Sequence, residues 1–150
     1  MKLIICFLML SPLLACKKPP EQPAAGAGQA ASVPADPGPA LLAPAGDRNQ
    51  LPGGGWFTWK FSEKPKLGTI IAKVQVFTSS GERDTSYEVT GESGMPSMRD
   101  HDSGQVKFQT NRKGDYLLPV NIVMAGEWRL LIKLQKDKTE AYAGKVLFSI

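Results

Sequence analysis

The sequence predicts an all-β protein: an immunoglobulin-like antiparallel sandwich of about seven strands, preceded by a disordered tether rich in proline, alanine and glycine. From residue 56 to residue 150, apolar residues recur with a period of two rather than 3.6, which is typical of half-buried strands. Glycine, proline and aspartate separate these stretches, as expected of short strands joined by turns. About 95 residues in seven short strands favour a sandwich, and a small open barrel is the alternative.

The expected strands follow one another along this part of the chain. They cover residues 55–61, 68–77, 85–91, 104–110, 115–123, 126–135 and 143–150. Alternation is clearest in the second strand and in the sixth, where Trp128 begins an apolar face and is the expected centre of the core. Pro119 lies inside the fifth strand, and proline cannot donate to a sheet ladder, so we expect an edge strand or a bulge there.

The first fifteen residues have the layout of a secretory signal. Lys2 precedes an apolar run over residues 3–14, which is too short to span a bilayer as a helix. The run ends in "LLAC", which resembles a bacterial lipobox and implies cleavage before Cys16 and diacylation of its sulfur. We therefore expect a signal peptide at 1–15, a lipidated tether at 16–55 and a sandwich domain at 56–150.

The segment after Cys16 has too little apolar surface to offset the entropy of ordering it, which predicts a disordered tether. Two acyl chains would give a stable membrane anchor where one is marginal. Lys17 and Lys18 follow Cys16 in place of the aspartate associated with inner-membrane retention. We expect a cell-envelope protein, held at the outer membrane and facing the periplasm if the host is Gram-negative.

Composition excludes several classes of function. Cys6 would leave with the signal and Cys16 would carry lipid, so no thiol remains for a disulfide, a nucleophile or a thiolate metal site. With one histidine the usual nucleophile–base pairs are also scarce, and we expect no enzyme. The net charge of +4 is mild and its basic residues are scattered, which argues against nucleic acid as a partner. The remaining aspartates are interpreted as solvated loop charges: Asp84, Asp100, Asp102 and Asp115.

The sulfur-bearing residues of the predicted domain fall in two turns. Met95, Met98 and His101 lie in "GMPSMRDH" at a regular spacing of three, and Met124 opens "MAGEW". In an antiparallel sandwich successive connections alternate between the two ends, so connections two strands apart should lie at the same end. These four residues could therefore converge. The tether would enter at the opposite end, so this end would face away from the membrane.

Thioether sulfur is a soft, neutral ligand that selects Cu(I) over harder divalent ions, and imidazole binds either copper state. Met95, Met98 and His101, with Met124 as a further donor, therefore form a candidate Cu(I) site. Methionine is also a flexible filler of cores, so the same residues could simply pack against the domain. A third alternative is Zn(II) or Cu(II) bound by His101 with nearby carboxylates.

The order of short motifs resembles a known family. "GMPSM…H", then "GDY", then "VMAGEWRLLIKL" is similar to the YtkA-like and FixH-like domains, which are small exported immunoglobulin-like domains of bacteria. The resemblance covers about residues 56–150 and implies the sandwich fold and an association with copper handling and respiratory oxidase assembly. Arg99 and Asp100 depart from the family pattern, because the loop of many relatives is richer in methionine, glycine and histidine.

Two functional hypotheses follow. The first is Cu(I) binding or delivery by the methionine and histidine loop of a lipid-anchored protein. The second is a metal-free interaction or scaffold domain that binds an envelope protein partner through its sheet faces or the same loop end. Leu131 and Ile71, on the second faces of their strands, would support the second hypothesis if they formed a contiguous patch.

Overall fold

The computed structural model describes residues 38–98 and 102–150, which all fall in one compact unit, Pro34–Ile150. These residues form strands without any helix, so nothing in the described chain is a helix able to cross a membrane. The strands are β1 (Ala40–Leu41), β2 (Asn49–Gln50), β3 (Trp56–Phe61), β4 (Gly68–Phe77), β5 (Glu88–Gly94), β6 (Val106–Lys107), β7 (Gln109–Thr110), β8 (Tyr116–Ile122), β9 (Glu127–Lys136) and β10 (Thr139–Ser149). Residues 1–37, with the expected signal and Cys16, lie outside the described range.

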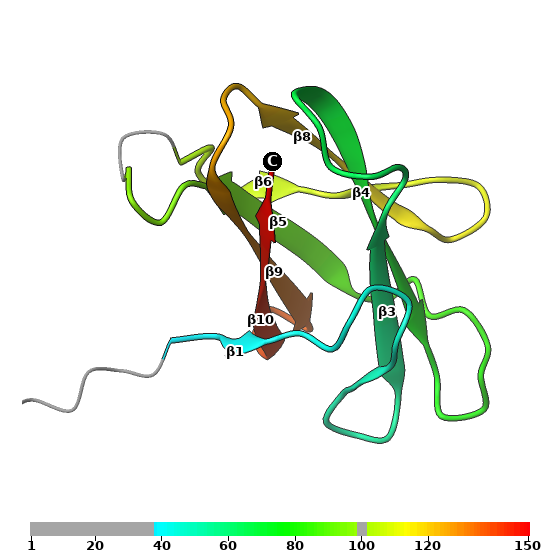
Figure 1. Ribbon diagram of the computed structural model, residues 1–150. Coiled ribbons are helices and arrows are strands. Elements are labelled where there is room, and N and C mark those ends of the chain that lie inside the picture. Colours follow the sequence, from blue (N-terminus) through cyan, green and yellow to red (C-terminus); the bar gives the residue numbers. More distant parts are fainter. Residues whose placement is uncertain (1–37, 99–101) are drawn as a thin grey trace, which may run out of the picture. The chain divides into compact units, whose positions relative to one another are not determined.

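The strands form two sheets, which Figure 1 shows facing each other. The first has the order β1-β10-β9-β5-β6 and the second the order β2-β3-β4-β8-β7. All neighbouring strands are antiparallel except β1, which runs parallel to β10. The predicted all-β sandwich is therefore confirmed, and each of the expected strands is present.

The predicted alternation also places the core. Along β4 and β9 every second side chain is buried, and Trp128 is 2% exposed. Removing such apolar surface from water contributes on the order of 25 cal/mol per Å². The largest side chains that are fully buried come from both sheets: Phe57, Ile70, Ile122, Leu130, Ile132 and Leu134.

The strand expected over residues 104–110 changes sheets at Phe108. Its first part, β6, pairs with β5 in the first sheet, and its second part, β7, pairs with β8 in the second. Phe108 between them is 2% exposed, and its N–H donates to the carbonyl of Val89 at 2.9 Å. Gly91 allows this packing, since a Cβ there would lie 2.8 Å from Cε2 of Phe108.

Pro119 lies at a sheet edge, as predicted. It stands opposite Ile71 of β4, while β7 pairs only with Tyr116 and Leu117 of the same strand. Beyond those two residues β8 is the edge of its sheet among the described strands, so the missing N–H of Pro119 costs no ladder bond.

The expected boundary at residue 56 is wrong, because residues 38–55 are part of the folded unit. β1 pairs with β10 and β2 with β3. Leu51 is 5% exposed, and the indole N–H of Trp59 donates to the carbonyl of Ala43 at 2.8 Å. The composition of this stretch suggested disorder, but a few well-placed apolar side chains and side-chain-to-backbone hydrogen bonds suffice to order it.

Candidate metal site at the methionine turns

The first methionine turn follows directly from the end of β5. Met95, Pro96, Ser97 and Met98 form a β-turn, in which the N–H of Met98 donates to the carbonyl of Met95 at 2.9 Å. Proline at the second position of a turn presets its φ, which explains why the chain reverses here. The two thioethers have different surroundings: Met95 is 5% exposed and belongs to the core, while Met98 is 44% exposed.

Met95 joins this turn to the second one. Its terminal methyl carbon lies 2.7 Å from the position that a Cβ would take at Gly126, so it packs directly on the glycine backbone. Gly126 has a φ of 139°, a conformation open to glycine but strained for other residues. The two connections predicted to share one end of the sandwich therefore do so.

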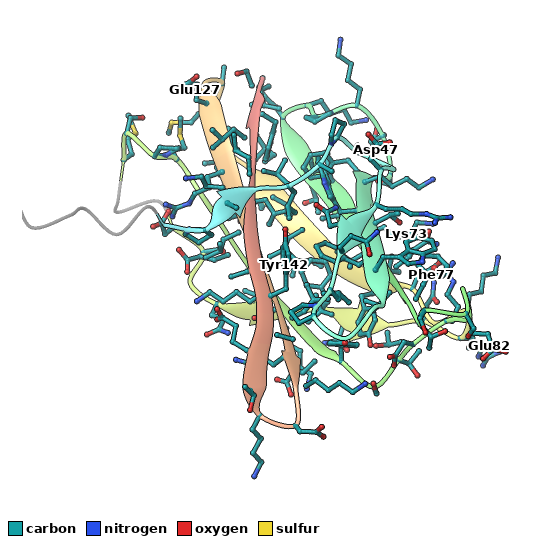
Figure 2. All side chains as sticks on the ribbon, turned by 90° about the horizontal axis from the view of Figure 1, so that it is seen from below. Asp47, Lys73, Phe77, Glu82, Glu127 and Tyr142 are labelled. Carbon is teal, nitrogen blue, oxygen red and sulfur yellow. The ribbon has the colours of Figure 1, made fainter. Side chains whose placement is uncertain are left out.

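Met124 lies at the start of the second turn. Its side chain is partly buried against the core, and its carbonyl accepts a hydrogen bond of 3.0 Å from the indole N–H of Trp128. In Figure 2 the sulfur atoms of the described methionines lie at the end of the sandwich marked by Glu127, away from Glu82. The structure thus brings Met95, Met98 and Met124 to one end.

His101, the fourth predicted ligand, lies in residues 99–101 and is outside the described range, as are Arg99 and Asp100. The described chain resumes at Asp102 and is at once tied back to β5. The N–H of Ser103 donates to the carbonyl of Ser93 at 2.7 Å, and the N–H of Ser93 donates to Oγ of Ser103 at 2.9 Å. In the sequence, His101 therefore lies between Met98 and Asp102, and both of these residues are held by contacts to the described chain.

Asp102 is already engaged by a cation. Nη2 of Arg129 lies 3.4 Å from its carboxylate and 3.3 Å from the carboxylate of Glu92. The Asp102 carboxylate also lies over Gly94, where a Cβ would overlap it. Among the described residues no group of three or more histidine, cysteine, aspartate or glutamate side chains could hold an ion.

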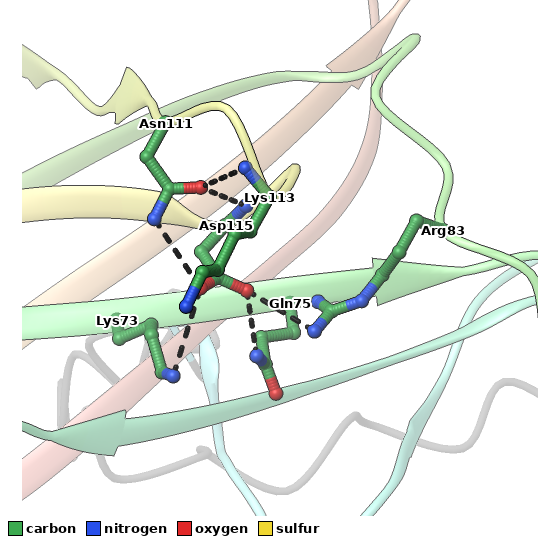
Figure 3. Close-up of polar contacts among 6 residues, drawn as sticks. All are labelled: Lys73, Gln75, Arg83, Asn111, Lys113 and Asp115. Atoms are coloured by element: carbon green, nitrogen blue, oxygen red, sulfur yellow. Dashed lines mark hydrogen bonds and ion pairs between the residues drawn. The ribbon is translucent and has the colours of Figure 1, made fainter.

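A buried carboxylate at the other end of β8 was missed by the sequence analysis. Asp115 is 6% exposed, not solvated as expected. One oxygen accepts a hydrogen bond of 2.6 Å from Gln75 and lies 3.1 Å from Nη2 of Arg83, and Lys73 lies 3.7 Å from the other (Figure 3). The side-chain amide of Asn111 donates to this second oxygen, Oδ2, at 3.3 Å.

Burial alone would raise the pKa of Asp115, but the hydrogen bonds from Gln75 and Asn111 and the charges of Lys73 and Arg83 outweigh it and lower that pKa below its ordinary value. The outward alternation of Lys73 and Gln75 along β4 was the only sequence signal for this network. We interpret it as structural, since all of its donors are directed at one carboxylate.

Tyr116, the next residue, is buried beside this network. Its hydroxyl donates to the carbonyl of Tyr87 at 2.8 Å. Burial, followed by the nearby negative charge of Asp84, raises its pKa to about 12. The phenol therefore remains protonated at neutral pH and ties β8 to the start of β5.

The outward faces of the two sheets carry separate apolar residues. Leu131 faces outward from β9 of the first sheet, and Ile71 from β4 of the second, so the contiguous patch considered from the sequence does not form. Leu131 instead lines a hollow of about 550 Å³ on the first sheet, together with Leu147, Arg129 and Lys145.

Comparisons with known proteins do not assign a family. No family model and no curated protein matches the chain. The YtkA-like and FixH-like resemblance therefore stays a prediction. Among solved structures, FetP of uropathogenic Escherichia coli strain F11 is 10% identical, with a TM-score of 0.47 over 72% of this chain and 95% of that one. A copper-bound variant of Campylobacter jejuni P19 is 13% identical, with a TM-score of 0.47 over 72% and 96%. Likeness at this level carries no argument about function.

Proposed function

We propose that this chain is a Cu(I)-binding protein of the cell envelope, with its metal site at the methionine turns and no catalytic role. One observation carries the proposal: Met95 packs on Gly126, which brings the Met95–Met98 turn and the Met124 turn to one end of the sandwich. Three thioethers and the single histidine of the chain then lie on two adjoining connections.

The donor set suits this metal. Thioether sulfur prefers Cu(I), and an exported protein without free thiols needs a ligand of this kind. Met98, which is 44% exposed, would receive the ion from solvent or from a donor protein, while Met95, which is 5% exposed, would be the inner ligand. Such a partly exposed site suits exchange of the ion rather than permanent storage.

A competitive Cu(I) titration against a chromogenic chelator tests the proposal. We expect one-to-one binding tighter than about micromolar. Met98→Leu and His101→Ala should each weaken it by more than tenfold, with smaller losses in Met95→Leu and Met124→Leu. Val123→Ala, in the same turn but without a ligand atom, is the matched control. Absence of competition, or equal binding by all five variants, would contradict the proposal.

The protein used should be the secreted chain from residue 16, with Cys16→Ser to prevent acylation. A domain cut at residue 48 or 56 would lose β1 and its pairing with β10. Near-ultraviolet circular dichroism of each variant then separates loss of a ligand from loss of the fold.

The membrane anchor is the second part of the proposal. Cys16 closes the sequence "LLAC", and Lys17 and Lys18 after it favour the outer membrane. Metabolic labelling with palmitate should mark the wild-type protein and the Cys6→Ser variant but not Cys16→Ser. Label that persists in Cys16→Ser would refute acylation at this residue.

A further inference from the structure

The outer edge of β10 has backbone groups that the described chain leaves unpaired. Ile150 exchanges hydrogen bonds with Gly126, at 3.1 and 3.3 Å, and so faces the β9 side. Lys145 faces the other way, because its carbonyl accepts the N–H of Leu42 at 2.9 Å. Since a strand alternates with a period of two, Leu147 and Ser149 also direct their N–H and C=O groups away from β9.

The strand β1 covers only part of this edge. It pairs with Gly144 and Lys145, and the last bond from its side is the one between Leu42 and Lys145. Beyond that point no described residue forms a backbone hydrogen bond with the outward groups of Leu147 or Ser149. An edge of this kind is a template for another strand.

The surface beside the open edge is apolar. Leu147 is 54% exposed and Leu41 is 63% exposed. Between them lies a hollow of about 410 Å³, to which Leu42, Trp59 and Val146 contribute. Leu147 also lines the hollow of about 550 Å³ on the outward face of the first sheet.

Lys145 is a cation at the same place, and the hollow on the first sheet is also lined by Arg129 and by the carboxylates of Glu92 and Glu127. Lys145 lines both hollows, and no carboxylate among the described residues lies within ion-pair distance of its ammonium group. A partner that covers this edge would therefore gain from a carboxylate opposite Lys145.

We propose that the β10 edge binds an extended segment of a partner protein as an added strand, with apolar side chains on Leu147 and Leu41 and an aspartate or glutamate at Lys145. Main-chain hydrogen bonds to an open edge, with alternate side chains in adjoining hollows, are the recognition mode of strand addition. The same kind of pairing already occurs within the chain, since β1 adds to this edge as a strand. The surface is separate from the methionine turns and does not depend on a bound metal.

Amide hydrogen exchange, followed by NMR on the secreted chain with Cys16→Ser, tests the proposal. The probe is a pool of synthetic hexapeptides of alternating valine and threonine, with one aspartate at a varied position. In the free protein the amides of Leu147 and Ser149 should exchange fast, while those of Val146 and Phe148 are protected. At a peptide concentration about 100 times the Kd, the two edge amides should exchange about a hundredfold more slowly.

Two variants make the test specific. Leu147→Pro removes an edge donor and leaves the β9 ladder intact, so it should abolish binding. Asn121→Pro makes the same change on the open edge of β8, two residues after Pro119, and should leave binding unchanged. Lys145→Glu should no longer bind the aspartate peptides and should instead bind peptides with lysine at that position. Binding of the lysine peptides would show that the variant is folded.

Three results would overturn the proposal. The first is protection of Leu147 and Ser149 in the free chain that disappears when residues 16–37 are removed, because the occupant would then be the chain's own N-terminal segment. The second is protection that rises with protein concentration, which would identify a second copy. The third is unchanged exchange at both amides with every peptide of the pool.

Discussion

The indole nitrogen of Trp59 donates a hydrogen bond of 2.8 Å to the carbonyl of Ala43, which ties the segment before β2 to the middle of β3. The N–H of Ala43 donates in turn to Oδ1 of Asn49 at 2.9 Å, and the carbonyl of Trp59 accepts the N–H of Gly46 at 2.8 Å. Residues 43–49 are thus held by two bonds from Trp59 of β3 and by one bond within the segment, which explains how a segment rich in alanine, proline and glycine becomes ordered.

Trp59→Phe should lower the free energy of unfolding by about 1–3 kcal/mol, because it removes this bond and leaves the partly buried carbonyl of Ala43 without its donor. Urea denaturation measures the loss. Limited proteolysis should also show faster cleavage near Arg48, the exposed basic residue of the segment. Trp56→Phe is the matched control for the free energy of unfolding, since its indole forms no hydrogen bond in the described structure and stacks on Phe77 at 3.9 Å. It is not a control for cleavage near Arg48, because the guanidinium of Arg48 lies 4.2 Å from the centre of the Trp56 ring. Equal losses in the two variants would show that the bond does not hold the segment.

The strands were predictable because their signal is local. The alternation along 68–77 and 126–135 is a period-two pattern that any half-buried strand must show. The folding of residues 38–55 was not predictable in the same way. β1 is two residues long and forms through its pairing with β10, which is far away in the sequence, so no local periodicity predicts it.

The convergence of the methionine turns was predictable from topology alone, because strand parity depends on counting strands rather than on contacts. The different burial of Met95 and Met98 was not, since it depends on the packing of Met95 on Gly126. The burial of Asp115 was also missed. Loop aspartates are usually solvated, and only the fold brings Arg83 to this carboxylate.

Asp115→Asn should destabilise the protein at neutral pH by about 1–3 kcal/mol, because Lys73 and Arg83 lose their carboxylate partner. The folded-state pKa of Asp115 is lowered from the ordinary value of 3.8. Its contribution is therefore fully present above pH 3.8 and is lost as the pH falls through the lower folded-state pKa. The stabilities of wild type and variant should converge in strong acid.

Thermal unfolding of both proteins between neutral pH and strong acid measures this convergence. Asp137→Asn, at the exposed turn between β9 and β10, is the matched control and should change stability little at any pH. A constant difference between wild type and Asp115→Asn down to the lowest pH would show that the ionised carboxylate is not the stabilising group.

Gly126→Ala should disturb the fold and the metal site together. The φ of 139° strains any residue with a Cβ, and that atom would meet the methyl group of Met95 at 2.7 Å. We expect a loss of about 1–3 kcal/mol in the free energy of unfolding and weaker Cu(I) binding, since Met95 must move away from the turn. Gly81→Ala is the control, because its φ of 88° brings similar strain with no atom nearby. If the affinity for Cu(I) fell equally in both variants, the loss in Gly126→Ala would not come from the displacement of Met95.

Arg129 should hold the loop that contains His101. Its Nη2 lies 3.3 Å from Glu92 and 3.4 Å from Asp102, which is the first described residue after that histidine. Both pairs are partly exposed, so Arg129→Gln should cost only about 1 kcal/mol in the free energy of unfolding. The local effect should be larger, because releasing Asp102 removes one of the two ties between the loop and the first sheet, the other being the hydrogen bonds between Ser93 and Ser103.

The amide of Ser103, which donates to the carbonyl of Ser93 at 2.7 Å, reports on that tie. Its hydrogen exchange should become faster in Arg129→Gln, while exchange at Phe108, whose N–H donates to Val89, stays unchanged. Lys133→Gln, on the same outward face of β9, is the matched control and should alter neither amide. High salt should reproduce part of the effect in the wild type, since partly exposed ion pairs are screened. If Ser103 keeps its protection in Arg129→Gln, the serine hydrogen bonds alone hold the loop.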